Sequence, residues 1–241
     1  MKNSYILFIV SFILAGCTSA PTVLYSDDFT SGPDQWVIEA ESEQHQILLK
    51  DSILDVVAPG GITFWFHHKL EGNIQISFDS RVVDGGGPWD RVSDMNCFWM
   101  ANDPEHPDDF FARSEWRNGT FGKYYSLSLY YAGYGGNTNT TTRFRKYNGD
   151  YAAFAERRER PEILKEYTDP AHLITPNEWY HTEITILGNH IRYSVNNEIL
   201  FDYTDENPYT SGYFGFRTVK NHIQYRDFKV FQLQAEQSQD N

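Results

Sequence analysis

Alternation of apolar and polar residues runs through almost the whole sequence and constrains the fold more than any other feature. In the stretch 73–82, Ile74, Ile76 and Phe78 fall on one face of an extended chain, and the polar residues between them fall on the other. A two-residue period is typical of an antiparallel strand with one face in the core and one in water. The sequence therefore predicts a half-buried strand at 73–82.

The same pattern continues to the end of the chain. Residues 182–203 hold three alternating runs separated by a Gly-Asn and an Asn-Asn pair, which predicts a three-stranded meander because these residues tolerate the positive φ of tight turns. Two closing strands are predicted at 212–217 and 223–231. Helical periodicity is weak, and only 152–166 could form a short helix, which Pro161 interrupts. Many strands separated by turns indicate an all-β fold, a single-domain β-sandwich.

The first residues resemble a bacterial lipoprotein signal peptide. An apolar run at 5–15 leads to Leu14-Ala15-Gly16-Cys17, so we expect residues 1–16 to be removed and Cys17 to be lipidated. We then expect a tether at 17–24, the sandwich domain at 25–233 and a disordered polar tail at 234–241. No acidic cluster follows Cys17, which favours an anchor in the outer membrane facing the periplasm. Cys97 is then a single thiol in an apolar run and is predicted to be a small buried residue.

The net charge restricts the partner. With 33 acidic and 20 basic residues the chain carries a formal charge of −13, which argues against nucleic acid and against an anionic membrane surface. Membrane contact is expected only through the lipid on Cys17. An acidic sugar is compatible with this charge, provided that its site is locally basic.

Three segments combine aromatic, polar and cationic residues that strand formation alone does not explain. They are 84–104, 130–147 and 214–225. The substrate-binding candidates in them are Arg91, Asp94, Asn96, Trp99, Tyr131, Asn137, Arg143 and Arg145, and the catalytic candidates are Tyr134, Arg217 and His222. Taken singly, each residue also fits a surface ion pair or a solvated loop. Taken together, with an aromatic content of 16%, they favour a carbohydrate site, because aromatic rings pack against the CH faces of sugars.

The types of residue in these segments also favour one reaction over another. The Glu-x-Asp-x-x-Glu strand motif of jelly-roll glucanases is absent, although Asp90 and Asp94 remain a possible carboxylate pair for hydrolysis. Elimination from a uronic acid instead needs a cation or amide on the sugar carboxylate, a base and an acid. Arg143 or Arg217, with Asn96 or Asn137, would neutralise the carboxylate, and His222 and Tyr134 would move the protons. This chemistry requires no metal and no cofactor.

Several segments carry a family resemblance. "DDFTSGPDQW" and the closing strands resemble the concanavalin A-like jelly roll. "GGPWDRVSDMNCFWMANDP", "YYAGYGGNTNTTTRFRKYNG" and "SGYFGFRTVKNHIQYRDFKV" resemble a jelly-roll family encoded in bacterial polysaccharide-utilisation loci, and the chain is similar to the ulvan oligosaccharide dehydratase of that group. The resemblance implies removal of water from the terminal uronic acid of an ulvan-derived oligosaccharide, leaving a 4,5-unsaturated sugar.

Two alternatives stay open. "RSEWR" and "YYAGY" resemble motifs of jelly-roll alginate lyases, which would make Arg113 a secondary candidate in a polymer-cleaving lyase, although the Gln-Ile-His motif of those enzymes is missing. A non-catalytic sugar-binding lipoprotein would use the same aromatic groove. Fold analogy alone also leaves a structural calcium possible at Asp27 or Asp28.

Overall fold

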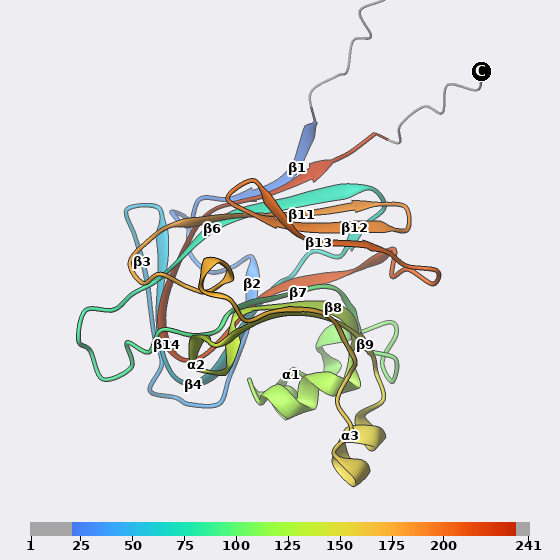
Figure 1. Cartoon of the computed structure of the whole chain (residues 1–241), viewed down its shortest axis with the longest axis horizontal. Coiled ribbons are helices and arrows are strands. Elements are labelled where there is room, and N and C mark those ends of the chain that lie inside the picture. The colour runs from blue at the N-terminus through green and yellow to red at the C-terminus, as the bar shows by residue number, and fades with distance from the viewer. Residues whose placement is uncertain (1–20, 235–241) are drawn as a thin grey trace, which may run out of the picture.

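The computed structural model describes residues 21–234, and antiparallel strands dominate this part of the chain (Figure 1). The predicted signal peptide, Cys17 and nearly all of the predicted tail lie outside the described residues. The strands are β1 (Thr22–Asp27), β2 (Trp36–Ala40), β3 (Gln46–Lys50), β4 (Ile53–Phe66), β5 (Leu70–Glu71), β6 (Ile74–Val82), β7 (Met95–Asn102), β8 (Ser128–Gly135), β9 (Thr141–Asn148), β10 (Ile163–Tyr167), β11 (Tyr180–Leu187), β12 (His190–Val195), β13 (Glu198–Thr204) and β14 (Ser211–Gln232). The helical segments are η1 (Phe110–Arg113), α1 (Ser114–Arg117), η2 (Phe121–Ser126), α2 (Gly136–Asn139), α3 (Tyr151–Arg157) and η3 (Pro170–His172).

The strands form two stacked layers. The first layer has the order β10-β9-β8-β7-β14-β4-β2, and the second has the order β14-β6-β11-β12-β13 with β1 and β3 at its edge. β14 and β4 are long enough to bend from one layer into the other, so hydrogen bonding is continuous around the sandwich (Figure 1). This arrangement confirms the predicted all-β jelly-roll sandwich.

A large apolar core fills the space between the layers. The alternating residues of β6 point into it as predicted, with Ile74, Ile76 and Phe78 all buried. Cys97 is buried there as well, which confirms its predicted role as a small core residue. The predicted meander is β11 to β13, and both asparagines of its second turn, Asn196 and Asn197, have positive φ.

Two local predictions differ from the structure. The closing segment is one strand, β14, which continues through a bulge at Lys220 instead of stopping between 217 and 223. The helix expected at 152–166 is only α3, because the chain leaves it at Arg158, before Pro161, and continues as β10. Within residues 21–234, no helix combines the length and the apolar character needed to cross a membrane.

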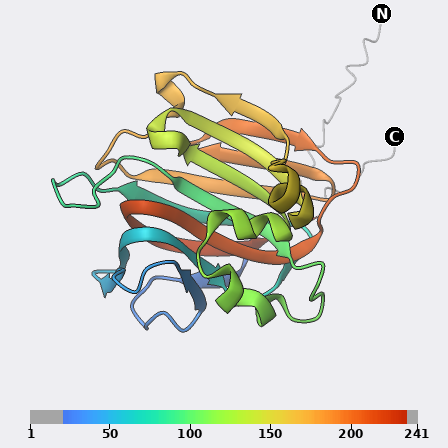
Figure 2. The ribbon, with the colours of Figure 1, turned by 90° about the horizontal axis from the view of Figure 1, so that it is seen from below.

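A helical cover lies on the outer face of the first layer. It consists of η1, α1, η2 and α3, which Figure 2 shows in green and gold in front of the strands. Under it is a second apolar cluster that includes Trp65, Phe98 and Tyr124. The cover occupies only part of the sheet, so the rest of that face stays open for a site.

A buried ionic network attaches this cover to the sheet. Arg117 is fully buried and its Nη2 lies 2.7 Å from Glu39 Oε1 on β2, while its Nη1 lies 3.4 Å from Asp103 Oδ2. Tyr124 donates to the other oxygen of Glu39 at 2.7 Å, and Arg113 donates to both oxygens of Asp103. Because paired charges are tolerated in the interior only with complete partners, the network fixes where η2 sits.

Candidate functional site

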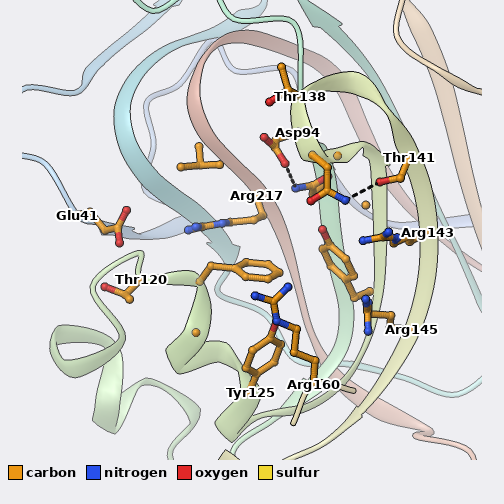
Figure 3. A pocket seen from close by; sticks show the side chains of 18 of the residues that line it. Glu41, Asp94, Thr120, Tyr125, Thr138, Thr141, Arg143, Arg145, Arg160 and Arg217 are labelled. Atoms are coloured by element: carbon orange, nitrogen blue, oxygen red, sulfur yellow. Dashed lines mark hydrogen bonds between the residues drawn. The ribbon is translucent and has the colours of Figure 1, made fainter. Parts of the chain in front are cut away.

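The open part of this face holds a cavity of about 520 Å³. It lies over β14, β7, β8 and β9, with the helical cover along one edge and the 84–94 loop and α2 along the opposite edge (Figure 3). Its lining residues are Glu41, Arg91, Asp94, Asn96, Thr120, Phe121, Gly122, Tyr125, Tyr131, Gly133, Gly136, Asn137, Thr138, Thr141, Arg143, Arg145, Arg160, Arg217 and Val219.

Strand register explains why distant segments meet in this cavity. Arg217 on β14 pairs with Asn96 on β7, Asn96 pairs with Gly133 on β8, and Gly133 pairs with Arg143 on β9. Residues that are directly opposite in neighbouring strands point to the same face of a sheet. The four therefore form one polar row across the floor of the pocket, and the next row holds Tyr131 and its partner Arg145.

Gly133 leaves a gap at the centre of this row. A Cβ at this position would lie 2.8 Å from Cζ of Tyr131 and closer still to its hydroxyl, so the phenol reaches across the glycine backbone. The Tyr131 side chain thus occupies the floor between Asn96 and Arg143, where only a residue without a side chain leaves room for it.

Gly133→Ala is expected to weaken sugar binding without unfolding the protein. The new methyl group must displace the Tyr131 ring from the pocket floor, whereas the backbone at Gly133 is ordinary strand that alanine adopts readily. Binding of an acidic oligosaccharide measured by calorimetry, together with thermal melting, checks this. Unchanged affinity would show that the phenol position has no part in binding.

Asn96 and Asp94 stand beside the glycine gap. Asn96 donates to Asp94 Oδ1 at 3.3 Å (Figure 3), and its own Oδ1 is buried without a hydrogen-bond partner among the described residues. Asp94 is held by Arg91 and by the Ser93 hydroxyl at 2.7 Å. Since a buried amide oxygen normally has a donor, the Asn96 side chain is poised to accept a hydrogen bond from a ligand.

Burial raises the pKa of Tyr131 well above that of an ordinary tyrosine, and the nearby charge of Asp94 raises it further. Arg217 opposes this shift without cancelling it. The phenol therefore stays protonated at neutral pH and can act as a proton donor beside a charged carboxylate.

The arginines of the pocket are held in different ways. Arg217 is almost fully buried, donates to the Gly119 carbonyl and lies 3.3 Å from the Thr63 hydroxyl. Arg143 pairs with Glu166 on β10, and Arg91 donates to the Val219 carbonyl at 2.7 Å as well as to Asp94. Five arginines and two carboxylates line the cavity, so it is a positive site in a negative chain.

The structure brings together most of the residues singled out from the sequence. Arg91, Asp94, Asn96, Tyr131, Asn137, Arg143, Arg145 and Arg217 all line the one cavity. Asn137 lies in α2, a tight turn with left-handed backbone, and its amide donates to Thr141 Oγ1 at 3.0 Å (Figure 3).

Three predicted site residues require correction, because they do not line the cavity. Tyr134 and Trp99 are buried in the core between the layers, where Tyr134 packs on Tyr180. Tyr134 is three positions from Tyr131 on β8, and Trp99 is three positions from Asn96 on β7. Side chains alternate between the two faces of a strand, so Tyr134 and Trp99 point to the face opposite the cavity. His222 lies beyond the bulge of β14, after this strand has bent toward the second layer.

His222 instead joins two carboxylates outside the cavity. Its Nε2 lies 3.0 Å from Asp55 and its Nδ1 lies 3.1 Å from Asp90. Asp90 also accepts from the backbone amides of Gly85 and Gly87, so the contact fixes the 84–94 loop that carries Arg91 and Asp94. The hydrogen bond that His222 donates to the Asp55 carboxylate raises the pKa of His222 above its ordinary value; partial burial opposes this shift, and Asp90 adds to it.

His222→Gln is expected to lower thermal stability in acid more than in alkali. A raised folded-state pKa contributes stability that is complete below the unfolded value of about 6.5 and is lost as pH rises through the folded value. The difference in melting temperature between wild type and variant should therefore shrink with rising pH. A difference independent of pH would contradict this account.

Other candidates from the sequence have structural roles. Arg113 pairs with Asp103 and Glu105 away from the cavity. Asp27 accepts from the Phe29 amide and from Trp36 Nε1. Between residues 21 and 234, no group of three or more His, Cys, Asp or Glu is arranged to hold a metal ion.

Some pocket residues were missed in the sequence. Phe121 and Tyr125 come from η2, Arg160 comes from the segment after α3, and Glu41 follows β2. None of these residues lies in a strand with an alternating apolar and polar pattern, and their position depends on how the helical cover packs. The run Glu156–Glu162, rich in charges and followed by β10, was the one available signal for Arg160.

Several solved protein structures have a fold similar to that of this chain. The sandwich is of the galectin-like kind: it is similar to a Bacillus subtilis protein of unknown function with a galectin-like fold, at 20% identity over 88% of this chain and 96% of that one, with a TM-score of 0.68. It is also similar to the carbohydrate-binding module CBM66 from Bacillus subtilis (12% identity, 82% and 96% covered, TM-score 0.53). A third similar structure is the VIP36 exoplasmic/lumenal domain in a form with Ca²⁺ and Man3GlcNAc bound (12% identity, 92% of this chain and 94% of that one covered, TM-score 0.58).

The chain belongs to the family described as a domain of unknown function (DUF6250), whose model matches residues 56–228. That span runs from β4 into β14 and contains every lining residue of the cavity except Glu41. No curated protein matches the sequence.

Proposed function

We propose that the cavity binds the non-reducing terminal uronic acid of an acidic, ulvan-derived oligosaccharide and eliminates water from it. The observation that carries the proposal is the positive pocket in a chain of net charge −13, with an unpartnered amide oxygen and a buried phenol at its centre. Structures of similar fold that are named for carbohydrate binding or solved with a bound oligosaccharide support a sugar as the ligand.

The sugar ring lies over the Gly133 gap in this proposal. Arg143 and Asn96 flank that gap. Arg143 binds the sugar carboxylate, which makes the proton on the neighbouring carbon more acidic. The Asn96 amide oxygen accepts a hydrogen bond from a sugar hydroxyl. The rim formed by Phe121 and Tyr125 offers aromatic faces to the ring.

Two neighbouring groups with opposite protonation states move the protons. Asp94, which pairs with Arg91, takes the C5 proton, and the electrons of the C–H bond form the C4=C5 double bond. The C4 hydroxyl departs as water with a proton from Tyr131. Transfer of the proton from Asp94 to the Tyr131 phenolate restores the site, so the sum is loss of one water molecule.

A non-catalytic sugar-binding role is the second candidate. One observation favours it: no histidine lines the cavity, and the two residues expected from the sequence as base and acid lie outside it. The same arginines and aromatic rim would then hold the sugar without reaction.

One assay separates these functions. Purified protein is mixed with saturated uronate-terminated oligosaccharides, and the ultraviolet absorbance of the conjugated double bond is followed together with product mass. A rise with loss of one water and no chain shortening supports the dehydratase. A rise with chain shortening contradicts it in favour of a polymer-cleaving lyase, and binding without a rise leaves the sugar-binding module.

A further inference from the structure

Two of the pocket arginines, Arg145 and Arg160, have no carboxylate partner among residues 21–234. Arg145 donates to the Pro161 carbonyl, and Arg160 makes neither an ion pair nor a side-chain hydrogen bond there. Both lie at the end of the cavity beside Tyr125 (Figure 3). Burial raises the pKa of Tyr125, and the positive charges of Arg160 and Arg145 oppose that shift.

The positive charge of each of the other three pocket arginines has a carboxylate nearby. Arg91 pairs with Asp94 and Arg143 pairs with Glu166. Arg217 has Glu41 nearby, since a Cβ added at Gly61 would lie 2.5 Å from the guanidinium and 2.7 Å from the carboxylate.

The excess positive charge of the cavity therefore resides at Arg145 and Arg160. Two guanidinium groups close together repel each other, and an anion between them removes this cost. Among residues 21–234, no carboxylate forms an ion pair with either guanidinium group, and Glu159, the neighbour of Arg160, pairs with Arg157 instead. An anionic group of a ligand would supply the counter-charge that this pair lacks.

The position of the pair relative to Arg143 suggests where on the ligand this charge lies. Arg145 is two residues along β9 from Arg143, which is roughly 7 Å on an extended strand. A single carboxylate is too small to contact both positions at once. A second group, on the next sugar of the chain, is better placed to reach Arg145.

A smaller hollow of about 190 Å³ continues the site on this side, because Tyr125 and Arg160 line both. The same hollow is also lined by Asp150, Glu159 and Glu162. Because these carboxylates repel an anion, a negatively charged group of a ligand is favoured in the main cavity beside Arg145 and Arg160, and an uncharged part of the ligand can occupy the hollow.

We infer that Arg145 and Arg160 form a second anion subsite, which binds a sulfate ester or carboxylate on the sugar adjoining the terminal uronic acid. The inference rests on the proposed function, because it takes the terminal sugar to lie over Gly133. It adds that the preferred ligand carries two acidic groups on neighbouring sugars.

Three uronate-terminated disaccharides test this subsite by calorimetry: one with a sulfate ester on the second sugar, one with a carboxylate there, and one with neither. Wild-type protein is expected to bind the better of the two doubly charged sugars roughly 10- to 100-fold more tightly than the singly charged one, from the strength of hydrogen bonds between charged groups. Whichever doubly charged sugar binds better identifies the group that the subsite takes.

The variants make the assignment specific. Arg160→Gln should abolish the preference for the second charge while keeping affinity for the singly charged disaccharide. Arg158→Gln, a change at an exposed arginine outside the cavity lining, should keep the preference and serves as the matched control. Equal wild-type affinities for all three sugars, or a preference that survives in Arg160→Gln, would overturn the subsite while the proposed function stands. Failure of all three sugars to bind would refute the proposed function and the subsite with it.

Discussion

Tyr131→Phe is expected to lower turnover of the uronate-terminated oligosaccharide by about 10² to 10⁴, the usual contribution of a positioned proton donor, while affinity changes little. The change removes one hydroxyl from the pocket floor and leaves the ring that covers Gly133. Burial and the charge of Asp94 raise the pKa of this phenol. Tyr125, the other lining tyrosine, lies on η2, so only the Tyr131 phenol reaches across Gly133. Steady-state rates of double-bond formation and calorimetric binding measure the two effects separately.

Tyr134→Phe is the matched control for this experiment. Tyr134 lies on the same strand, three residues away, but its phenol is in the core between the layers. The control should keep its turnover. Equal turnover in Tyr131→Phe and wild type would remove Tyr131 from the reaction.

Arg117→Ala is expected to reduce the free energy of unfolding by about 3–5 kcal/mol, the range found when one partner of a buried ion pair is removed. The substitution leaves Glu39 and Asp103, both almost fully buried, without their shared cation. The loss should extend to function, because the network fixes η2, which supplies Phe121 and Tyr125 to the pocket rim. Urea unfolding monitored by tryptophan fluorescence gives the stability change.

Arg157→Ala provides the comparison for Arg117. Arg157 pairs with Glu159 on the exposed surface of α3, and exposed pairs contribute little. Its unfolding curve should overlay that of wild type. If Arg117→Ala also unfolds at the wild-type urea concentration, the buried network does not hold the cover in place.

The strands could be predicted because their information is local. A two-residue period identifies β6 and the β11–β13 meander without knowledge of their partners, and the paired asparagines identify a turn. The polar segments were informative for the same reason: Arg143 and Arg217 lie where a strand had no need of a cation, and register brings them to one cavity. Arg91 reaches the same cavity from the 84–94 loop.

The side of the sheet on which a residue lies was harder to predict. Alternation shows that Tyr131 and Tyr134 point to opposite faces, but it does not say which face is the core. The bulge at Lys220 and the bend of β14 decide the position of His222, and both arise from packing between the layers. Arg160 and Tyr125 reach the pocket only because the helical cover folds over the sheet, which no local pattern encodes.

Recognition of an acidic sugar by the arginine-lined cavity is the property on which the proposed function depends most. Calorimetric titration of the protein with a uronate-terminated oligosaccharide and with its carboxyl-reduced counterpart tests this directly, because the two ligands differ only in charge and hydrogen bonding at one group. We predict that the acid binds, that its affinity falls as salt is added, and that the reduced sugar binds far more weakly. Equal binding of the two sugars, or binding of neither, would contradict the account.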